Sequence, residues 1–179
     1  MEFTDDTGFA ALIAVTEATK SVVLENCRVT SSSIVGGDWN GALIGWAAGY
    51  SDPKDGPVFT VVDITDCVVS GNTLIGGGST GSLIGHATAN QWTQVNVSET
   101  YVIGNTITGG QADGGRTDKT GIVFGTTGWG QTYLEKDGGV NISGIVSYGN
   151  NNTLNSNIFG RIGQTGGTIN VYGGDFRDA

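Results

Sequence analysis

Short runs of apolar residues alternate with polar residues along most of this chain. Val62 and Ile64 flank Asp63, and the same spacing recurs at intervals further along the sequence. A spacing of two places one set of side chains on one face of an extended strand. Val, Ile and Thr dominate these runs and glycine-rich turns bound them, so the pattern predicts many short strands. Only residues 9–18 allow a helical spacing, and that stretch is either a short capping helix or the first strand.

The pattern repeats at a fixed offset of 40 residues. Residues 22–45 read VVLENCRVTSSSIVGGDWNGALIG, and residues 62–85 read VDITDCVVSGNTLIGGGSTGSLIG. A third unit begins at Val95, shifted by 33, and returns to the offset of 40 after an insertion at 111–120. A fourth unit spans 140–160, and a fifth begins at Gly167. A fixed period of this size indicates stacked structural units.

Each unit contains about three predicted strands, around VxI, CxVxxxxI and GxLIG. Such a unit cannot bury its apolar face alone, and stacking places equivalent residues in ladders. The predicted fold is an all-β, single-domain, right-handed parallel β-helix of four to five coils. Residues 1–21 form an N-terminal cap or partial coil, 22–160 the repeat coils, and 161–179 a terminal partial coil. The alternative, a β-propeller, needs antiparallel strands, and we expect no tight Asn-Gly or Asp-Gly hairpin between the runs.

The composition narrows the classes of partner. The chain has 32 glycines, 2 prolines and a formal net charge of −9. An acidic, lysine-poor surface argues against nucleic acid and anionic membranes as partners. No apolar run is long enough to span a bilayer, and no signal peptide is recognisable, so we expect a segment cut from a longer secreted protein.

The two cysteines occupy the same repeat position. Cys27 and Cys67 should stack on adjacent coils with Cα atoms about 5 Å apart, which is within disulfide range. Thr100 and Ile145 fill the same position in later units, which indicates an inward core position. The sequence favours free, buried thiols over a disulfide between Cys27 and Cys67, but it does not decide between the two. Two cysteines without a CxxC pair do not predict a metal site.

The closing segments of the units resemble a known repeat family. Residues 40–45 (NGALIG), 80–85 (TGSLIG) and 120–125 (TGIVFG), with the preceding ENC and TDC strands, resemble the GLUG-type repeats of putative adhesins in Bacteroidetes-like bacterial surface proteins. The similarity covers roughly residues 20–160. It implies an extracellular or cell-surface, adhesion-related role with a host or bacterial glycan or a cell-surface protein as partner, and it brings no catalytic motif.

Candidate catalytic groups are few. The single histidine, His86, directly follows an LIG segment and is expected to be an exposed loop residue, since no GxSxG nucleophile motif accompanies it. Asp66 and Glu99 fall in one repeat column. They form either a carboxylate pair suited to acid–base catalysis or an outward polar column that keeps the surface soluble.

The acidic loops, such as the 111–120 insertion with Asp113, offer carboxylate oxygens that could bind calcium. No calcium-loop motif is present, and we predict no metal and no cofactor.

Tryptophans give the clearest candidate binding site. Trp46 and His86 share a repeat column, and Trp92 and Trp129 lie in longer connections nearby. Exposed rings can stack on sugar faces, so we predict a ligand-binding surface of Trp46, His86, Trp92, Trp129 and Asp113. The other interpretation is that the rings cover corners of the coil.

The sequence therefore leaves three possible functions open. The first is a non-enzymatic, adhesin-like or glycan-binding segment, the second is a β-helical polysaccharide lyase or glycoside hydrolase, and the third is a passive structural spacer. The longest connections, 46–58, 86–94, 111–120 and 126–139, are expected to gather along one side of the coil and to carry any binding function.

Overall fold

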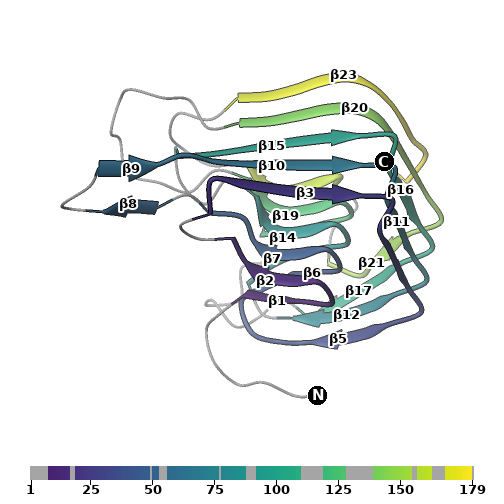
Figure 1. The fold of residues 1–179 in the computed structure, drawn as a ribbon. Coiled ribbons are helices and arrows are strands. Elements are labelled where there is room, and N and C mark those ends of the chain that lie inside the picture. The colour runs from purple at the N-terminus through teal and green to yellow at the C-terminus, as the bar shows by residue number, and fades with distance from the viewer. Residues whose placement is uncertain are drawn as a thin grey trace.

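Parallel strands in stacked sheets make up the structure, a computed structural model shown in Figure 1. It describes residues 8–16, 19–48, 50–52, 56–76, 78–87, 92–109, 119–127, 139–154, 157–162 and 168–178. These residues contain many strands and no α-helix. The architecture is all-β and consistent with a parallel β-helix.

The first sheet carries the clearest apolar ladder. Val22, Val62, Val95, Val140 and Ile169 are direct neighbours on successive parallel strands. The middle three are fully buried or nearly so, which confirms the inward ladder that the repeat predicts. The eight strands of this sheet are β3 (Ser21–Glu25), β4 (Arg28–Thr30), β10 (Thr60–Thr65), β11 (Val68–Ser70), β15 (Thr93–Ser98), β16 (Tyr101–Ile103), β20 (Gly139–Tyr148) and β23 (Thr168–Phe176).

The chain then turns back into a second sheet. Ile34, Leu74 and Ile107 are its inward ladder, paired across parallel strands and buried. Its four strands are β5 (Ser33–Val35), β12 (Thr73–Gly76), β17 (Thr106–Gly109) and β21 (Asn151–Asn152).

The GxLIG segment forms two strands joined by a tight turn, whereas the sequence predicted one strand there. We call each such pair an arch. The first strands of the arches are β1 (Gly8–Ala10), β6 (Trp39–Gly41), β13 (Ser79–Gly81) and β18 (Thr120–Gly121). The second strands are β2 (Ile13–Val15), β7 (Ile44–Trp46), β14 (Ile84–Ala87), β19 (Phe124–Thr127) and β22 (Phe159–Ile162). Each set forms its own parallel sheet.

The arches lie between the first and second sheets, so the molecule has four layers (Figure 1). Residues 40–45, 78–87 and 119–127 are buried at every position. A segment that buries both faces shows no apolar–polar alternation, which is why the sequence did not reveal the second strand. At the arch tips, the amides of Leu43 and Leu83 donate to the carbonyls of Leu83 and Val123, which stacks these equivalent residues in a further ladder.

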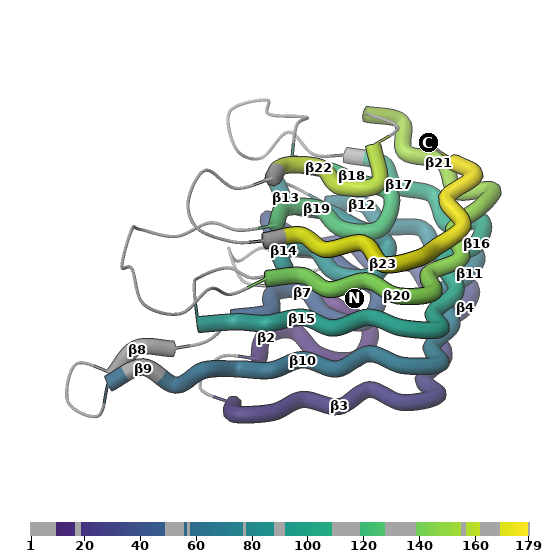
Figure 2. Tube along the Cα trace, turned by 90° about the horizontal axis from the view of Figure 1, so that it is seen from above, coloured from purple at the N-terminus to yellow at the C-terminus, as the bar shows by residue number. Residues whose placement is uncertain are grey.

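One connection departs from the parallel arrangement. Strands β8 (Tyr50–Asp52) and β9 (Gly56–Val58) form an antiparallel hairpin that projects from one edge of the stack (Figure 2). It is the single antiparallel pairing in the described part of the chain and lies outside the stacked sheets. Asp55-Gly56 lies where the chain enters β9, so the expectation of no Asp-Gly hairpin between the runs was wrong at this connection. At the N-terminus, the strand alternative for residues 9–18 is confirmed by β1 and β2.

An asparagine ladder fixes the corner between the first and second sheets. The side-chain Nδ2 groups of Asn72 and Asn105 donate to the Oδ1 atoms of Asn105 and Asn150, each at 2.9 Å. The same Oδ1 atoms accept the backbone amides of Asn72 and Asn105. Nδ2 of Asn105 also satisfies the carbonyl of Val69 at 3.0 Å. The buried backbone at this corner is thus paired by side chains rather than by a sheet.

Cys27 and Cys67 are neighbours in the stack, and both are free thiols, as the sequence favoured. The amide of Val68 donates to the Cys27 carbonyl at 2.8 Å, which fixes the two positions one above the other. Cys67 is fully buried and Cys27 is partly buried. Burial is the main cause that raises the pKa of the Cys67 thiol, so this group behaves as a small apolar core residue.

Replacing Asn105 with Ala should lower the free energy of unfolding by about 2 kcal/mol, because it removes the acceptor of two Asn72 donors and one donor to the Val69 carbonyl in the interior. Asn96→Ala is the matched control. Asn96 stands in a half-buried amide row on the outside of the first sheet, bonded to Asp63 and Asn141. Its loss should cost less than about 1 kcal/mol because water replaces the partners. Urea unfolding of both variants measures the difference, and equal losses would show that the inner ladder has no special role.

Candidate binding site

The open ends of the arches bring two columns of side chains face to face. Trp39 and Ser79 are paired on the first arch sheet, and Trp46, His86 and Thr126 follow one another on the second. We call these five residues the arch-mouth cluster. The cluster stands at the edge where strands β7, β14 and β19 lead into the long connections.

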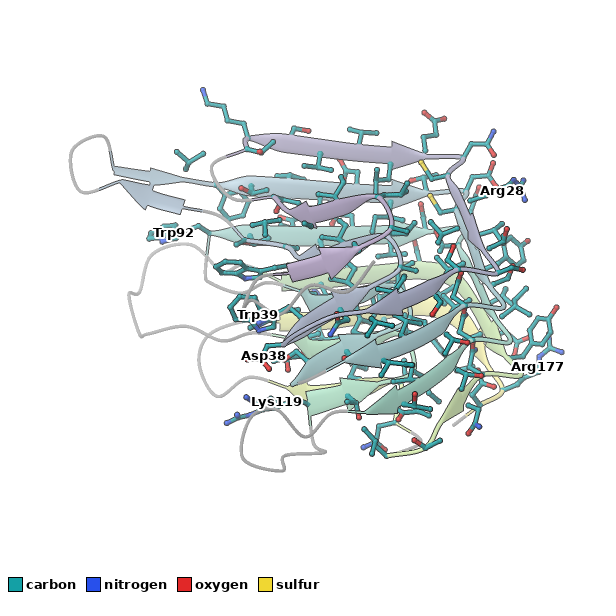
Figure 3. The ribbon with its side chains drawn as sticks, turned by 90° about the horizontal axis from the view of Figure 1, so that it is seen from below. Arg28, Asp38, Trp39, Trp92, Lys119 and Arg177 are labelled. Atoms are coloured by element: carbon teal, nitrogen blue, oxygen red, sulfur yellow. The ribbon has the colours of Figure 1, made fainter. Side chains whose placement is uncertain are left out.

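Trp39 and Trp46 are in direct ring contact. Their ring centroids are 4.6 Å apart with an interplanar angle of 36°. The His86 ring centroid lies 6.1 Å from that of Trp39. Both tryptophans are only partly buried, so part of this aromatic surface remains accessible. Figure 3 shows Trp39 at the edge of the ribbon, near Asp38.

His86 is not the exposed loop residue that the sequence predicted. It belongs to β14, and 4% of its surface is accessible. The strand continues past the LIG segment, and the arch brings Trp39 against the imidazole, which explains the burial. Burial is the main cause that lowers the pKa of His86 to about 3, and the positive charge of Lys119 lowers it further. The imidazole is therefore neutral at pH 7.

Three polar atoms of the cluster have no hydrogen-bond partner: Nδ1 and Nε2 of His86, and Nε1 of Trp46. A neutral imidazole offers one donor and one acceptor, and an indole N–H offers one donor. Ser79 and Thr126 are already paired, with their hydroxyl oxygens 2.8 Å apart. The cluster thus combines a partly accessible aromatic surface, on which a ligand could stack, with buried polar atoms that have no partner in the structure. Among the residues that the structure describes, no carboxylate is hydrogen-bonded to His86, as one would be to the histidine base of a catalytic triad.

The remaining predicted tryptophans and loop acids are distributed differently. Trp92 is partly buried just before β15, on the same side of the molecule as Trp39 (Figure 3). Its carbonyl accepts the amide of Thr60 at 2.7 Å. Trp129 and Asp113 lie outside the described residues.

Asp66 and Glu99 do stand in one column, as the sequence predicted. Both are exposed and both have left-handed backbone, with φ of 51° and 47°. Asn26 has φ of 53° at the same corner of the preceding unit, and Gly144 has φ of 77° at the following one. The column is therefore a sharp turn after β10 and β15, at the ends of these strands remote from Trp92.

Within the described ranges, no group of three or more His, Cys, Asp or Glu side chains is placed to hold a metal ion. The residues that the structure describes also include no helix that is long and apolar enough to cross a bilayer.

Comparison with known proteins adds no assignment. No protein-family model, curated protein or solved structure matches this chain. The similarity to GLUG-type repeats therefore remains a proposal.

Sequence reasoning found two members of the cluster and missed three. Trp46 and His86 were identified from the shared repeat column. Trp39, Ser79 and Thr126 were not predicted as site residues. Trp39 and Trp46 are seven residues apart in the sequence. Their rings touch only because the chain between them folds into an arch.

The low pKa of His86 predicts a pH-dependent stability. As the pH falls below about 6.5, the unfolded chain binds a proton that the folded chain does not bind until about pH 3. The wild type should therefore lose up to about 1.4 kcal/mol per pH unit from this group alone across that window. His86→Phe, which keeps a ring beside Trp39, should show a shallower loss. Urea unfolding at several pH values compares the two proteins, and parallel profiles would contradict the buried neutral imidazole.

Proposed function

We propose that this chain is a right-handed parallel β-helix that binds glycans without catalysis, as an adhesin-like segment of a secreted or cell-surface bacterial protein. The single observation that supports binding is the partly accessible Trp39–Trp46 ring pair at the open end of the arches, which covers the buried, unpartnered polar atoms of His86 and Trp46. The resemblance of the LIG segments to GLUG-type repeats supports the surface location.

The chemistry of the cluster fits a sugar. The C–H faces of a pyranose stack on aromatic rings, and its hydroxyl groups both donate and accept hydrogen bonds. The neutral imidazole offers no charge to the ligand, and the chain carries a net charge of −9. These two features favour a neutral glycan over an acidic one.

The scaffold suits binding through an edge. Stacked strands hold the cluster rigidly, while the connections beyond β7, β14 and β19 are free to differ from unit to unit. An open edge binds a single sugar weakly, so useful affinity requires several sites acting together.

An enzymatic function has weaker support. It rests on Asp66 and Glu99, which are exposed at the turns after β10 and β15, where water screens the carboxylates.

A glycan array followed by tryptophan-fluorescence titration tests the proposal. Binding to at least one neutral glycan is expected, and Trp39→Ala and Trp46→Ala should each weaken it by about tenfold or more, the equivalent of about 1.4 kcal/mol. Tyr101→Ala is the matched control, because Tyr101 is an aromatic residue with 43% of its surface exposed on another face. Circular dichroism verifies that each variant is folded.

Two outcomes would contradict the proposal. If no glycan binds, the chain is better explained as a structural spacer. If Tyr101→Ala weakens binding as much as the tryptophan variants, the arch-mouth cluster is not the site.

A further inference from the structure

The outer face of the first sheet carries two columns of small polar side chains. Each column has one member on β10, β15 and β20, which lie side by side within the sheet (Figure 2). The first column is Asp63, Asn96 and Asn141, and the second is Thr65, Ser98 and Ser143. All six alternate with buried core residues and are half-buried or exposed. The strands β3 and β23 flank them, so the columns are a face of the stack and not one of its ends.

The first column is an amide row with a single direction of hydrogen bonding. Nδ2 of Asn141 donates to Oδ1 of Asn96 at 2.9 Å, and Nδ2 of Asn96 donates to Oδ1 of Asp63 at 2.7 Å. Nε2 of Gln94 also donates to Oδ1 of Asn96, at 2.9 Å. A side-chain amide carries two N–H hydrogens, and each asparagine uses one of them along the row. The second hydrogen has no partner among the described residues, so it is available at the surface.

The second column adds hydroxyl groups in the same register. The hydroxyl oxygens of Thr65 and Ser98 are 3.0 Å apart and share one hydrogen bond. Neighbouring strands stand about 4.8 Å apart, so both columns repeat their polar groups at that spacing. Because their neighbours already hold these side chains, a ligand that binds them has little left to order. The face is thus a flat, preorganised grid of donors and acceptors.

Charge and size narrow the class of ligand for this face. Asp63 is the one charged residue among the six, although the whole chain carries a net charge of −9. None of the six is aromatic, so the columns offer no ring on which a single sugar could stack. The contacts are small and repeated, and such contacts give useful affinity only when a ligand makes many of them at once. These properties fit an uncharged, repetitive surface better than a small soluble ligand.

We propose that this face binds the surface of an insoluble, neutral polysaccharide built from extended β-linked chains. Successive sugars of such a chain are spaced nearly as neighbouring strands are, so a chain along the stacking direction meets one rung with each sugar. Its hydroxyl groups accept from the second amide hydrogens of Asn96 and Asn141 and donate to the carboxylate of Asp63. The inference shares the ligand class of the proposed function but assigns a second site, and it does not depend on binding at the arch-mouth cluster.

Co-sedimentation with insoluble polysaccharides tests the proposal. The wild type should bind microcrystalline cellulose or chitin saturably. It should bind granular starch, whose α-linked chains coil, about tenfold more weakly or worse. Ser98→Arg raises a long charged side chain above the face and should weaken binding by about tenfold or more. Asn96→Ala breaks the amide row and should weaken binding by about threefold or more, the loss of one or two hydrogen bonds.

Ser70→Arg is the matched control. Ser70 is also a half-buried serine on the outside of the first sheet, but it lies on β11, beyond the turn at Asp66. This variant should bind like the wild type. Circular dichroism verifies that each variant is folded.

Three results would overturn the proposal: a wild type that binds neither cellulose nor chitin, an equal loss in Ser70→Arg, or equally tight binding to starch. A loss of polymer binding in Trp46→Ala but not in Ser98→Arg would also overturn it, and would leave the glycan site at the arch-mouth cluster intact. Conversely, polymer binding that is lost in Ser98→Arg, in a protein that binds no soluble glycan, would support this site and contradict only the arch-mouth one.

Discussion

The close approach of the two arch sheets is the constraint on which the rest of the structure depends. A Cβ atom on Gly125 would lie 2.3 Å from the Gly85 carbonyl oxygen and 2.6 Å from the Thr80 amide nitrogen. One on Gly85 would lie 2.5 Å from the Asn40 amide nitrogen. These neighbours are backbone atoms and cannot move aside as a side chain could. Glycine inside the stack of arches is therefore a steric requirement, which explains why it recurs at Gly45, Gly85, Gly125 and Gly160; in the first arch Ala14 takes its place.

The arch determines both the core and the candidate site. Because the two arch strands approach through glycine, their larger side chains point outward toward the first and second sheets, where Leu43, Ile84 and Phe124 are completely buried. The same geometry places Trp39 against Trp46 at the open end. A single structural device thus accounts for the four layers, the burial of His86 and the aromatic surface proposed to bind sugars.

The sequence predicted much of the scaffold and less of the site. Alternation and the offset of 40 identified the parallel ladders and the stacked cysteines, because side chains on the outer layers have one buried and one exposed face. The arch buries both faces and leaves no alternation to detect. Without the arch, the contact of Trp39 with Trp46 and the burial of His86 could not be predicted. The pairing of Asn72 with Asn105 was visible only as a repeated residue, since an amide ladder and a polar turn look alike in sequence.

Substituting glycine at two positions tests the buried arch most directly. Gly125→Ala places a methyl group against backbone of both arch sheets, whereas Gly173→Ala meets no atom within 4 Å. The account predicts that Gly125→Ala lowers the free energy of unfolding by more than about 3 kcal/mol or prevents folding, the range of severe overpacking. It predicts that Gly173→Ala remains within about 0.5 kcal/mol of the wild type. Urea unfolding of both variants decides the matter, and a Gly125→Ala protein as stable as Gly173→Ala would contradict the buried arch.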